Sequence, residues 1–327
     1  MYAPEMDLWR VSMMRNVIAL VIMLVLLMGA AMAPGDLVTT IDAHSSAVNA
    51  VAATPAGDAV FTAGKDGRLK VWDTSSFALL MDVPACQAAI NDIAVSDDGM
   101  YLVTAGDDGY VKVWDAMTTE LMIAIPAHDG PANCVAITSD SLYIYTGGDD
   151  GFVRAWGVED DYALVLEAHT NFHGVNDLVI NSGDGYFFTA GVDGFITAYN
   201  AITGEQESRI EAYENGEALC LAFNSLESCL LTGGSNGEIR CWDSATGAMT
   251  HKIRAHAGNV NQIGFSDLTG LAVSAGADGK IKLWNFDAEM AGTMQAHVLA
   301  VNSFAMVGDA LVTGGADYKV RVWEANF

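Results

Sequence analysis

One twelve-residue pattern recurs along nearly the whole chain. Thr104–Asp115 reads TAGDDGYVKVWD, and six other stretches resemble it closely. The aromatic anchors of the seven copies are Trp72, Trp114, Trp156, Tyr199, Trp242, Trp284 and Trp323. Successive anchors are 42, 42, 43, 43, 42 and 39 residues apart. A fixed period of this length predicts a repeat fold, in which each unit buries its apolar face against its neighbours.

Each repeat reads as four short strands, which we call a to d in chain order. In the second repeat, alternating apolar and polar residues and many β-branched and aromatic residues predict these strands. Their predicted ranges are Ile90–Val95, Tyr101–Ala105, Tyr110–Trp114 and Leu121–Ile125. Asp108-Gly109 predicts a hairpin turn between strands b and c, because glycine accepts positive φ.

The period, with a His upstream and a Trp-Asp pair at the end of the repeat, resembles the WD40 family. The resemblance implies an all-β fold: a seven-bladed β-propeller of four-stranded antiparallel blades covering residues 36–327. Leu37–Ile41 stands before the first repeat, where a strand d belongs, and the chain stops just after the seventh strand c. We therefore expect the N-terminal strand d to join the C-terminal strands a–c, which leaves no free edge between the first and last blades.

Residues 1–35 form an apolar leader. Val17–Ala33 is uninterrupted apolar sequence, at the lower edge of the length that spans a bilayer. Its small-residue end resembles a signal-peptidase site, although Pro34, Glu5 and Asp7 do not suit a signal peptide. A signal peptide, a signal anchor, a leader without a targeting role and a wrong gene start stay open. The leader favours the secretory pathway or membrane anchorage, whereas members of the WD40 family are mostly intracellular.

The five cysteines predict neither a disulfide framework nor a metal site. Cys86 and Cys134 lie in separate repeats, and Cys220, Cys229 and Cys241 lie on three successive strands of one repeat. An odd number leaves at least one thiol free, and no CxxC or Cys/His ligand spacing occurs. We expect buried, unreactive thiols, and no metal or cofactor.

The WD40 resemblance also implies a buried chain of hydrogen bonds in each complete repeat, joining a His, a strand-b hydroxyl, the turn Asp and the Trp indole. A buried Asp is costly unless paired, and a Trp N–H needs an acceptor, so such a set would lock the d–a loop to its own b–c turn. The expected sets are His44, Thr62, Asp66, Trp72; His128, Thr146, Asp150, Trp156; His256, Ser274, Asp278, Trp284; and His297, Thr313, Asp317, Trp323.

The same residue types occur in nucleophilic catalysis, but an enzyme does not need such a set in every repeat, whereas a scaffold does. We therefore predict no catalytic residues. Departures from the pattern predict weaker locks in blades 2, 4 and 5: Cys86 replaces His, Tyr199 replaces Trp, Tyr213 replaces His and Asn236 replaces Asp. In the fourth repeat, Ala168 precedes the His position and two extra residues precede the inner strand.

The chain is strongly acidic. It carries 15 Lys and Arg against 41 Asp and Glu, and the charges of the leader cancel. Such a surface repels nucleic acid and anionic membranes and attracts basic partners, or it only keeps the protein in solution. Asp82 to Glu167 holds 16 acids and two bases, whereas Lys252 to the end holds seven acids and six bases.

The resemblance implies that d–a loops and b–c turns share one face, the usual partner site of the family. Asn stands at the start of six of the seven inner strands, where it either rings the channel mouth for a partner or is simply favoured at this family position. Asp97, Asp98 and Glu159–Asp161 are expected on the opposite face. The predicted partner-binding residues are Asp107, Asp129, Asp149, Asn91, Asn133 and Lys65.

Together these features predict a non-catalytic protein–protein interaction scaffold with an acidic sector that binds a basic segment. We expect a monomeric propeller within a complex, with no nucleic-acid partner and membrane contact only through the leader. Two alternatives stay open: a structural subunit of a large assembly, and an extracytoplasmic propeller enzyme that uses the channel.

Overall fold

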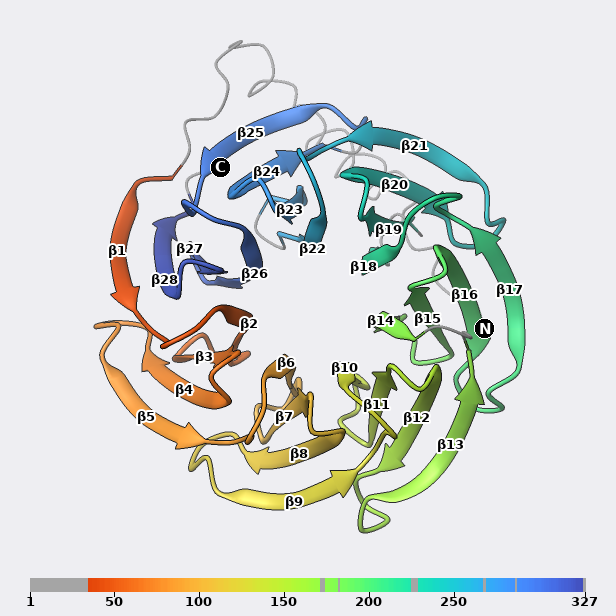
Figure 1. The fold of residues 1–327 in the computed structure, drawn as a ribbon, viewed down its shortest axis with the longest axis horizontal. Coiled ribbons are helices and arrows are strands. Elements are labelled where there is room, and N and C mark those ends of the chain that lie inside the picture. Colours follow the sequence, from red (N-terminus) through yellow and green to blue (C-terminus); the bar gives the residue numbers. More distant parts are fainter. Residues whose placement is uncertain are drawn as a thin grey trace, which may run out of the picture.

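A computed structural model describes residues 35–170, 174–181, 183–224, 229–266, 269–285 and 287–325. The predicted leader, apart from Gly35, lies outside this part of the chain. The described residues form 28 strands and no helix, so no helix among them could cross a membrane. The strands make seven four-stranded sheets arranged as blades in a ring (Figure 1). The all-β, seven-bladed fold predicted from the repeat is confirmed.

Each position within a blade is filled by one strand from every repeat. The inner a strands are β2 (Val48–Ala53), β6 (Ile90–Val95), β10 (Ala132–Ile137), β14 (Val175–Ile180), β18 (Ala218–Asn224), β22 (Val260–Phe265) and β26 (Val301–Val307). The b strands are β3 (Ala59–Gly64), β7 (Tyr101–Gly106), β11 (Tyr143–Gly148), β15 (Tyr186–Gly191), β19 (Cys229–Gly234), β23 (Ala272–Gly276) and β27 (Ala310–Gly315).

The two outer positions complete the blades. The c strands are β4 (Arg68–Asp73), β8 (Tyr110–Asp115), β12 (Phe152–Gly157), β16 (Phe195–Asn200), β20 (Glu238–Asp243), β24 (Lys280–Trp284) and β28 (Lys319–Glu324). The d strands are β5 (Leu79–Pro84), β9 (Leu121–Pro126), β13 (Ala163–His169), β17 (Gln206–Glu211), β21 (Met249–Arg254), β25 (Met290–Gln295) and β1 (Leu37–Asp42).

The ring closes through its two ends. The sheet of blade 7 has the order β1-β28-β27-β26, and β1 pairs antiparallel with β28, with Ile41 opposite Val320. In Figure 1, β1 lies at the outer edge beside β28. The predicted closure is confirmed, as are the four strands of the second repeat, three of which extend one residue further than predicted.

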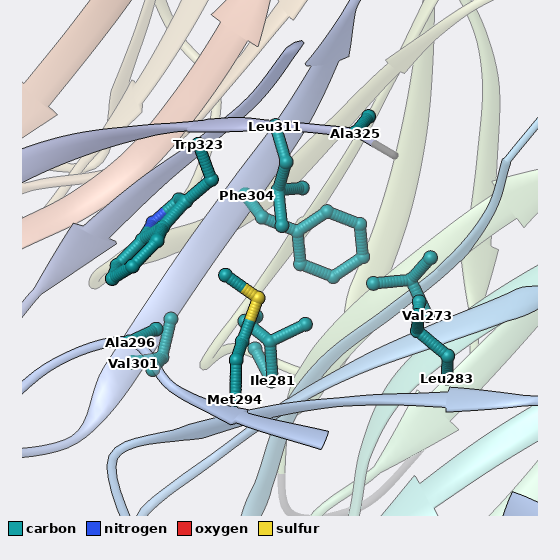
Figure 2. Close-up of a cluster of buried hydrophobic side chains, with 11 residues drawn as sticks. Val273, Ile281, Leu283, Met294, Ala296, Val301, Phe304, Leu311, Trp323 and Ala325 are labelled. Carbon is teal, nitrogen blue, oxygen red and sulfur yellow. The ribbon is translucent and has the colours of Figure 1, made fainter. Parts of the chain in front are cut away.

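The core consists of apolar clusters between neighbouring blades. Figure 2 shows the cluster between blades 6 and 7, where Phe304 and Leu311 from blade 7 pack against Val273 and Ile281 from blade 6. Trp323 closes the same cluster from β28. Burying one such side chain stabilises the fold by about 1.5–3 kcal/mol. Because each cluster joins two blades, no blade buries its apolar faces alone.

The two faces of the ring carry different connections. Strands alternate in direction within a blade, so the b–c turns and the d–a loops meet at one end of the blades and the a–b and c–d turns meet at the other. We call the first the loop face and the second the turn face. The loop face holds the predicted locks and partner-binding residues.

Candidate functional site

Four blades have a complete hydrogen-bonded lock beneath the loop face. In blade 1, His44 Nδ1 lies 2.9 Å from Asp66 Oδ1, and His44 Nε2 lies 2.9 Å from Thr62 Oγ1. Trp72 Nε1 donates to the same Thr62 oxygen at 2.9 Å. Blades 3, 6 and 7 repeat these contacts at 2.7–3.2 Å in the predicted sets. The d–a loop of each of these blades is thereby tied to its own b–c turn.

The charge states of these groups follow from burial and hydrogen bonding. Burial lowers the pKa of His44 despite the raising effect of Asp66, so the imidazole is neutral and donates from Nδ1. Burial alone would raise the pKa of Asp66, but the donors His44 and the Ser45 N–H lower it overall. The His and Asp residues of the other three locks shift in the same directions.

A cation on strand c reinforces the lock, and the sequence reasoning missed it. The third residue of strand c is basic in six blades: Lys70, Lys112, Arg154, Arg240, Lys282 and Arg321. Arg154 Nη1 donates to Asp150 Oδ2 at 2.7 Å and to the carbonyl oxygen of Ala127, which precedes the lock His, at 2.9 Å. The repeat pattern could have predicted this cation, because a basic residue lies two positions before the aromatic anchor in six of the seven repeats.

Blades 2 and 5 replace the His by other arrangements. In blade 2, Lys112 Nζ donates to Asp108 Oδ2 at 2.9 Å and to the Ala85 carbonyl at 2.8 Å, beside Cys86. In blade 5, the hydroxyl of Tyr213 lies 3.1 Å from Thr232 Oγ1, and the Arg240 guanidinium lies over the Tyr213 ring at 4.5 Å. These are substitute networks rather than gaps, so weaker locks in these blades remain a prediction.

Blade 4 departs furthest from the pattern. Thr197 stands at the strand-c cation position, and Tyr199 donates its hydroxyl to the Thr170 carbonyl at 3.2 Å. His169, which follows Ala168, lies in the β12–β13 ladder opposite Phe152 with an exposed side chain. Residue 169 is therefore not at the lock position. Trp156 pairs with Leu164, eight residues later, whereas Trp114 pairs with Leu121, seven residues later, so one extra residue in the c–d turn shifts strand d along the chain.

The ring of Asn residues fastens each blade to the next. The second residue of every inner strand lies at a break in register with strand b, and such a bulge turns its side chain out of the ladder. The six Asn Nδ2 groups donate to the first carbonyl of the next inner strand at 2.7–2.9 Å. In blade 5 this residue is Leu219, and Cys220 Sγ instead contacts the Val260 carbonyl at 3.4 Å. This favours a structural reason for Asn at these positions.

The central channel is polar, with a volume of about 270 Å³. It is lined by two half-buried carboxylates that also link blades. Asp92 Oδ2 accepts from the Val135 N–H at 2.9 Å, and Asp177 Oδ2 accepts from the Leu221 N–H at 2.7 Å. Burial raises the pKa of Asp92 to about 6, and burial together with the charge of Asp92 raises the pKa of Asp177 to about 8.

The predicted acidic residues lie together on the loop face. Asp107, Asp129 and Asp149 are exposed. Asn91 donates to Asp107 Oδ1 at 2.8 Å and Asn133 donates to Asp149 Oδ1 at 2.7 Å, so both carboxylates are oriented. The turn that contains Asp107 contacts the loop that contains Asp129, because the Gly109 carbonyl accepts from the N–H groups of residues 127 and 128. The amides thus use their N–H groups within the fold, and the carboxylates that they orient remain exposed on the loop face. Lys65 is exposed at the corresponding turn of blade 1.

Two cysteines differ from the prediction of free thiols. The structure pairs Cys229 of β19 with Cys241 of β20 as a disulfide, with Cα atoms 6.4 Å apart, because the two strands are neighbours in blade 5. Cys86, Cys134 and Cys220 are free. Within the described ranges, no group of three or more His, Cys, Asp or Glu side chains could hold a metal ion.

Comparison with known proteins assigns the repeat. The sequence profile described as WD domain, G-beta repeat matches residues 35–73, 79–115, 119–157, 204–243, 247–285 and 289–324. The chain belongs to the WD40 repeat family. WD40 propellers generally act as non-enzymatic scaffolds that bind other proteins. The matched segments leave out residues 158–203, which include most of blade 4.

Curated relatives share parts of this WD40 chain. Mitochondrial division protein 1 of Neurospora crassa is 30% identical over 81 residues, 24% of this chain and 12% of that protein. Transducin beta-like protein 3 of Rattus norvegicus is 30% identical over 119 residues, 35% of this chain and 15% of that protein. Nuclear distribution protein nudF of Aspergillus niger is 25% identical over 114 residues, 33% of this chain and 26% of that protein. The match thus spans a quarter or less of the length of most of these relatives.

Proposed function

We propose that this WD40 propeller is a non-catalytic interaction scaffold, a monomeric unit within a complex, that holds a basic segment of a partner protein. The binding site is the acidic sector, which we define as Asp107, Asp129 and Asp149. The observation that carries the proposal is the grouping of three exposed carboxylates on adjoining loops of blades 2 and 3, two of them oriented by Asn side chains. Oriented acceptors suit the planar or multiple donors of Arg and Lys.

The charge of the surrounding blades supports a basic partner. The segment from Asp82 to Glu167 carries 16 acids and two bases, so the field over blades 2 and 3 is strongly negative. Exposed ion pairs contribute about 0–1 kcal/mol each, and they change association rate and salt dependence more than affinity. The sector therefore steers a basic segment, and further contacts are needed for tight binding.

Charge reversal with a matched control tests this proposal. In the acidic-sector variant, all three aspartates become Lys. In the control, the exposed acids Asp97, Glu159 and Asp160 of the turn face become Lys. Both variants gain the same charge, so their difference reports location. Asp98 is left intact because its carboxylate accepts hydrogen bonds from Ser96 and the Met100 N–H.

The probe is a fluorescent oligolysine peptide titrated over a range of salt concentrations. We expect the acidic-sector variant to bind roughly 10-fold more weakly, with a flatter salt dependence. Its melting temperature should stay close to that of the wild type, because the three carboxylates are exposed. If the turn-face control loses binding and the acidic-sector variant keeps it, the partner face has been assigned to the wrong side of the ring.

A further inference from the structure

Blade 7 departs from the other blades at two places on the loop face. Its b–c turn has Tyr318 where the other six blades have glycine, and the backbone φ of Tyr318 is 69°. Its d–a loop has Val298 and Leu299 directly after the lock residue His297. The two loops are joined: the Ala316 N–H donates to the Ala300 carbonyl at 2.9 Å.

The backbone of this turn is suited to glycine. A Cβ atom on Gly67 would lie 2.3 Å from the Cys86 carbonyl oxygen, and one on Gly279 would lie 2.4 Å from the His297 carbonyl oxygen. Positive φ is a strained conformation for a bulky L-residue, and such residues are concentrated at functional sites. Since the same turn forms with glycine in six blades, the fold does not require an aromatic side chain there.

The three side chains are unusually open to solvent for apolar residues. Val298 is 82% exposed, Leu299 54% and Tyr318 50%. The other described d–a loops have small or polar residues at the two positions after the lock residue: Ser45, Ser46, Gln87, Ala88, Asp129, Gly130, Glu214, Asn215, Ala257 and Gly258. Two separate departures thus bring large apolar groups to one blade on the face that also carries the acidic sector.

We propose that Tyr318, Val298 and Leu299 form an apolar anchor site, where the partner inserts one large aliphatic or aromatic side chain. This inference rests on the proposed function, because the same partner segment reaches the acidic sector. Exposed aromatic and aliphatic side chains gain most when a partner removes them from water, and Tyr is enriched among residues that dominate binding energy. Blade 1 lies between the two sites, so the segment crosses the loop face in an extended form.

The charge of the protein identifies the occupant. A second copy of this chain would bring a surface with a net charge of −26 against another of the same sign. A segment that carries Lys or Arg at some distance from a Leu, Met, Phe or Trp side chain matches both sites. The anchor supplies affinity that the exposed ion pairs of the acidic sector do not.

Random peptides displayed on phage and selected on immobilised full-length protein provide the probe. The anchor variant combines Tyr318→Gly, Val298→Ser and Leu299→Ser. Its matched control is Met117→Ser with Ile202→Ser, which removes two apolar side chains that are each 85% exposed in c–d turns of the turn face. The single variant Tyr318→Gly separates binding from folding, since glycine relieves the strained φ and should leave the unfolding midpoint equal or higher.

We expect the wild type and the control to enrich peptides that combine a large apolar residue with Lys or Arg. The anchor variant should bind such a peptide roughly 10-fold more weakly, and Tyr318→Gly alone should weaken binding without lowering the midpoint.

Enrichment of basic peptides that bind wild type and anchor variant equally would overturn the anchor site and leave the acidic sector intact. Enrichment of apolar peptides insensitive to the acidic-sector variant would overturn the proposed function instead. Concentration-dependent dimers that the anchor variant abolishes would show that a second copy occupies the patch, and no enrichment at all would contradict both proposals.

Discussion

At the scale of single residues, the locks show how one carboxylate can serve several donors. Asp150 accepts from His128 at 2.8 Å, from Arg154 at 2.7 Å and from the Phe152 N–H at 3.2 Å. We expect Asp150→Ala to destabilise the protein by roughly 2–4 kcal/mol, because it leaves a buried His and a partly buried Arg without their acceptor. Denaturant unfolding would measure this loss.

Asn236 provides the comparison for Asp150. Its Oδ1 atom accepts a local hydrogen bond from the Glu238 N–H at 2.9 Å, and blade 5 has Tyr213 in place of the lock His. Asn236→Ala should therefore cost clearly less than Asp150→Ala. Equal losses for the two variants would show that blade 5 is locked as firmly as blade 3.

The channel carboxylate Asp177 predicts a specific pH dependence. Its pKa is raised to about 8 by burial and by the charge of Asp92, from an ordinary value of 3.8. A raised pKa means that the folded state keeps the Asp177 proton at pH values where the unfolded state has lost it. The contribution of Asp177 to the unfolding free energy is therefore fully present below pH 3.8 and is lost as the pH rises to about 8. The unfolding free energy of the wild type minus that of Asp177→Asn should increase by about 1.4 kcal/mol for each unit by which the pH is lowered within this range. A difference between the two proteins that does not change with pH would contradict the assignment.

At the scale of strands and turns, the sequence predicts the elements better than the contacts between blades. Alternation and the Asp-Gly turn predict all four strands of blade 2 to within a residue. The Asn side chains donate to a different blade, so the periodicity within one repeat cannot show their role. The shift of His169 follows from one extra residue in the c–d turn of blade 3, and the resulting register of strand d is set by its pairing with strand c. The placement of Asp107 and Asp149 on one face could be predicted because residues at equal positions in a repeat lie at equal positions in the ring.

Asn302 makes one of the inter-blade hydrogen bonds at the closing junction. Its Nδ2 atom donates to the Val48 carbonyl at 2.9 Å and so joins the last inner strand to the first. Asn302→Leu reproduces the residue that blade 5 has naturally, and we expect it to lower the unfolding free energy by about 0.5–1.5 kcal/mol. Asn215→Leu, at an exposed position, should stay within about 0.5 kcal/mol of wild type. Indistinguishable midpoints for the two variants would remove the structural role assigned to the Asn ring.

At the scale of the whole molecule, closure by β1 protects the edge of β28. Deletion of residues 1–42 removes β1 and exposes the backbone N–H and C=O groups of that edge, which promotes pairing between chains. We expect this deletion to lower the unfolding midpoint and to cause concentration-dependent aggregation, measured by light scattering. Deletion of residues 1–34 retains β1 and should keep the midpoint. If both deletion variants aggregate equally, protection of the β28 edge does not depend on β1, and this prediction is wrong.

The two faces of the ring differ in the exposed side chains that they carry. The loop face combines the acidic sector over blades 2 and 3 with the apolar side chains of blade 7, whereas acids of the turn face such as Asp97 and Asp160 lie at the other end of the strands. The central claim is that a partner segment lies on the loop face and covers the acidic sector.

Hydrogen–deuterium exchange of the propeller, with and without a saturating peptide from the phage selection, tests that claim most directly. We predict slower exchange in residues 107–109, 128–130 and 149–151 when the peptide is bound, with no change in residues 97–99 and 159–161. Slower exchange confined to the turn-face segments would contradict the account.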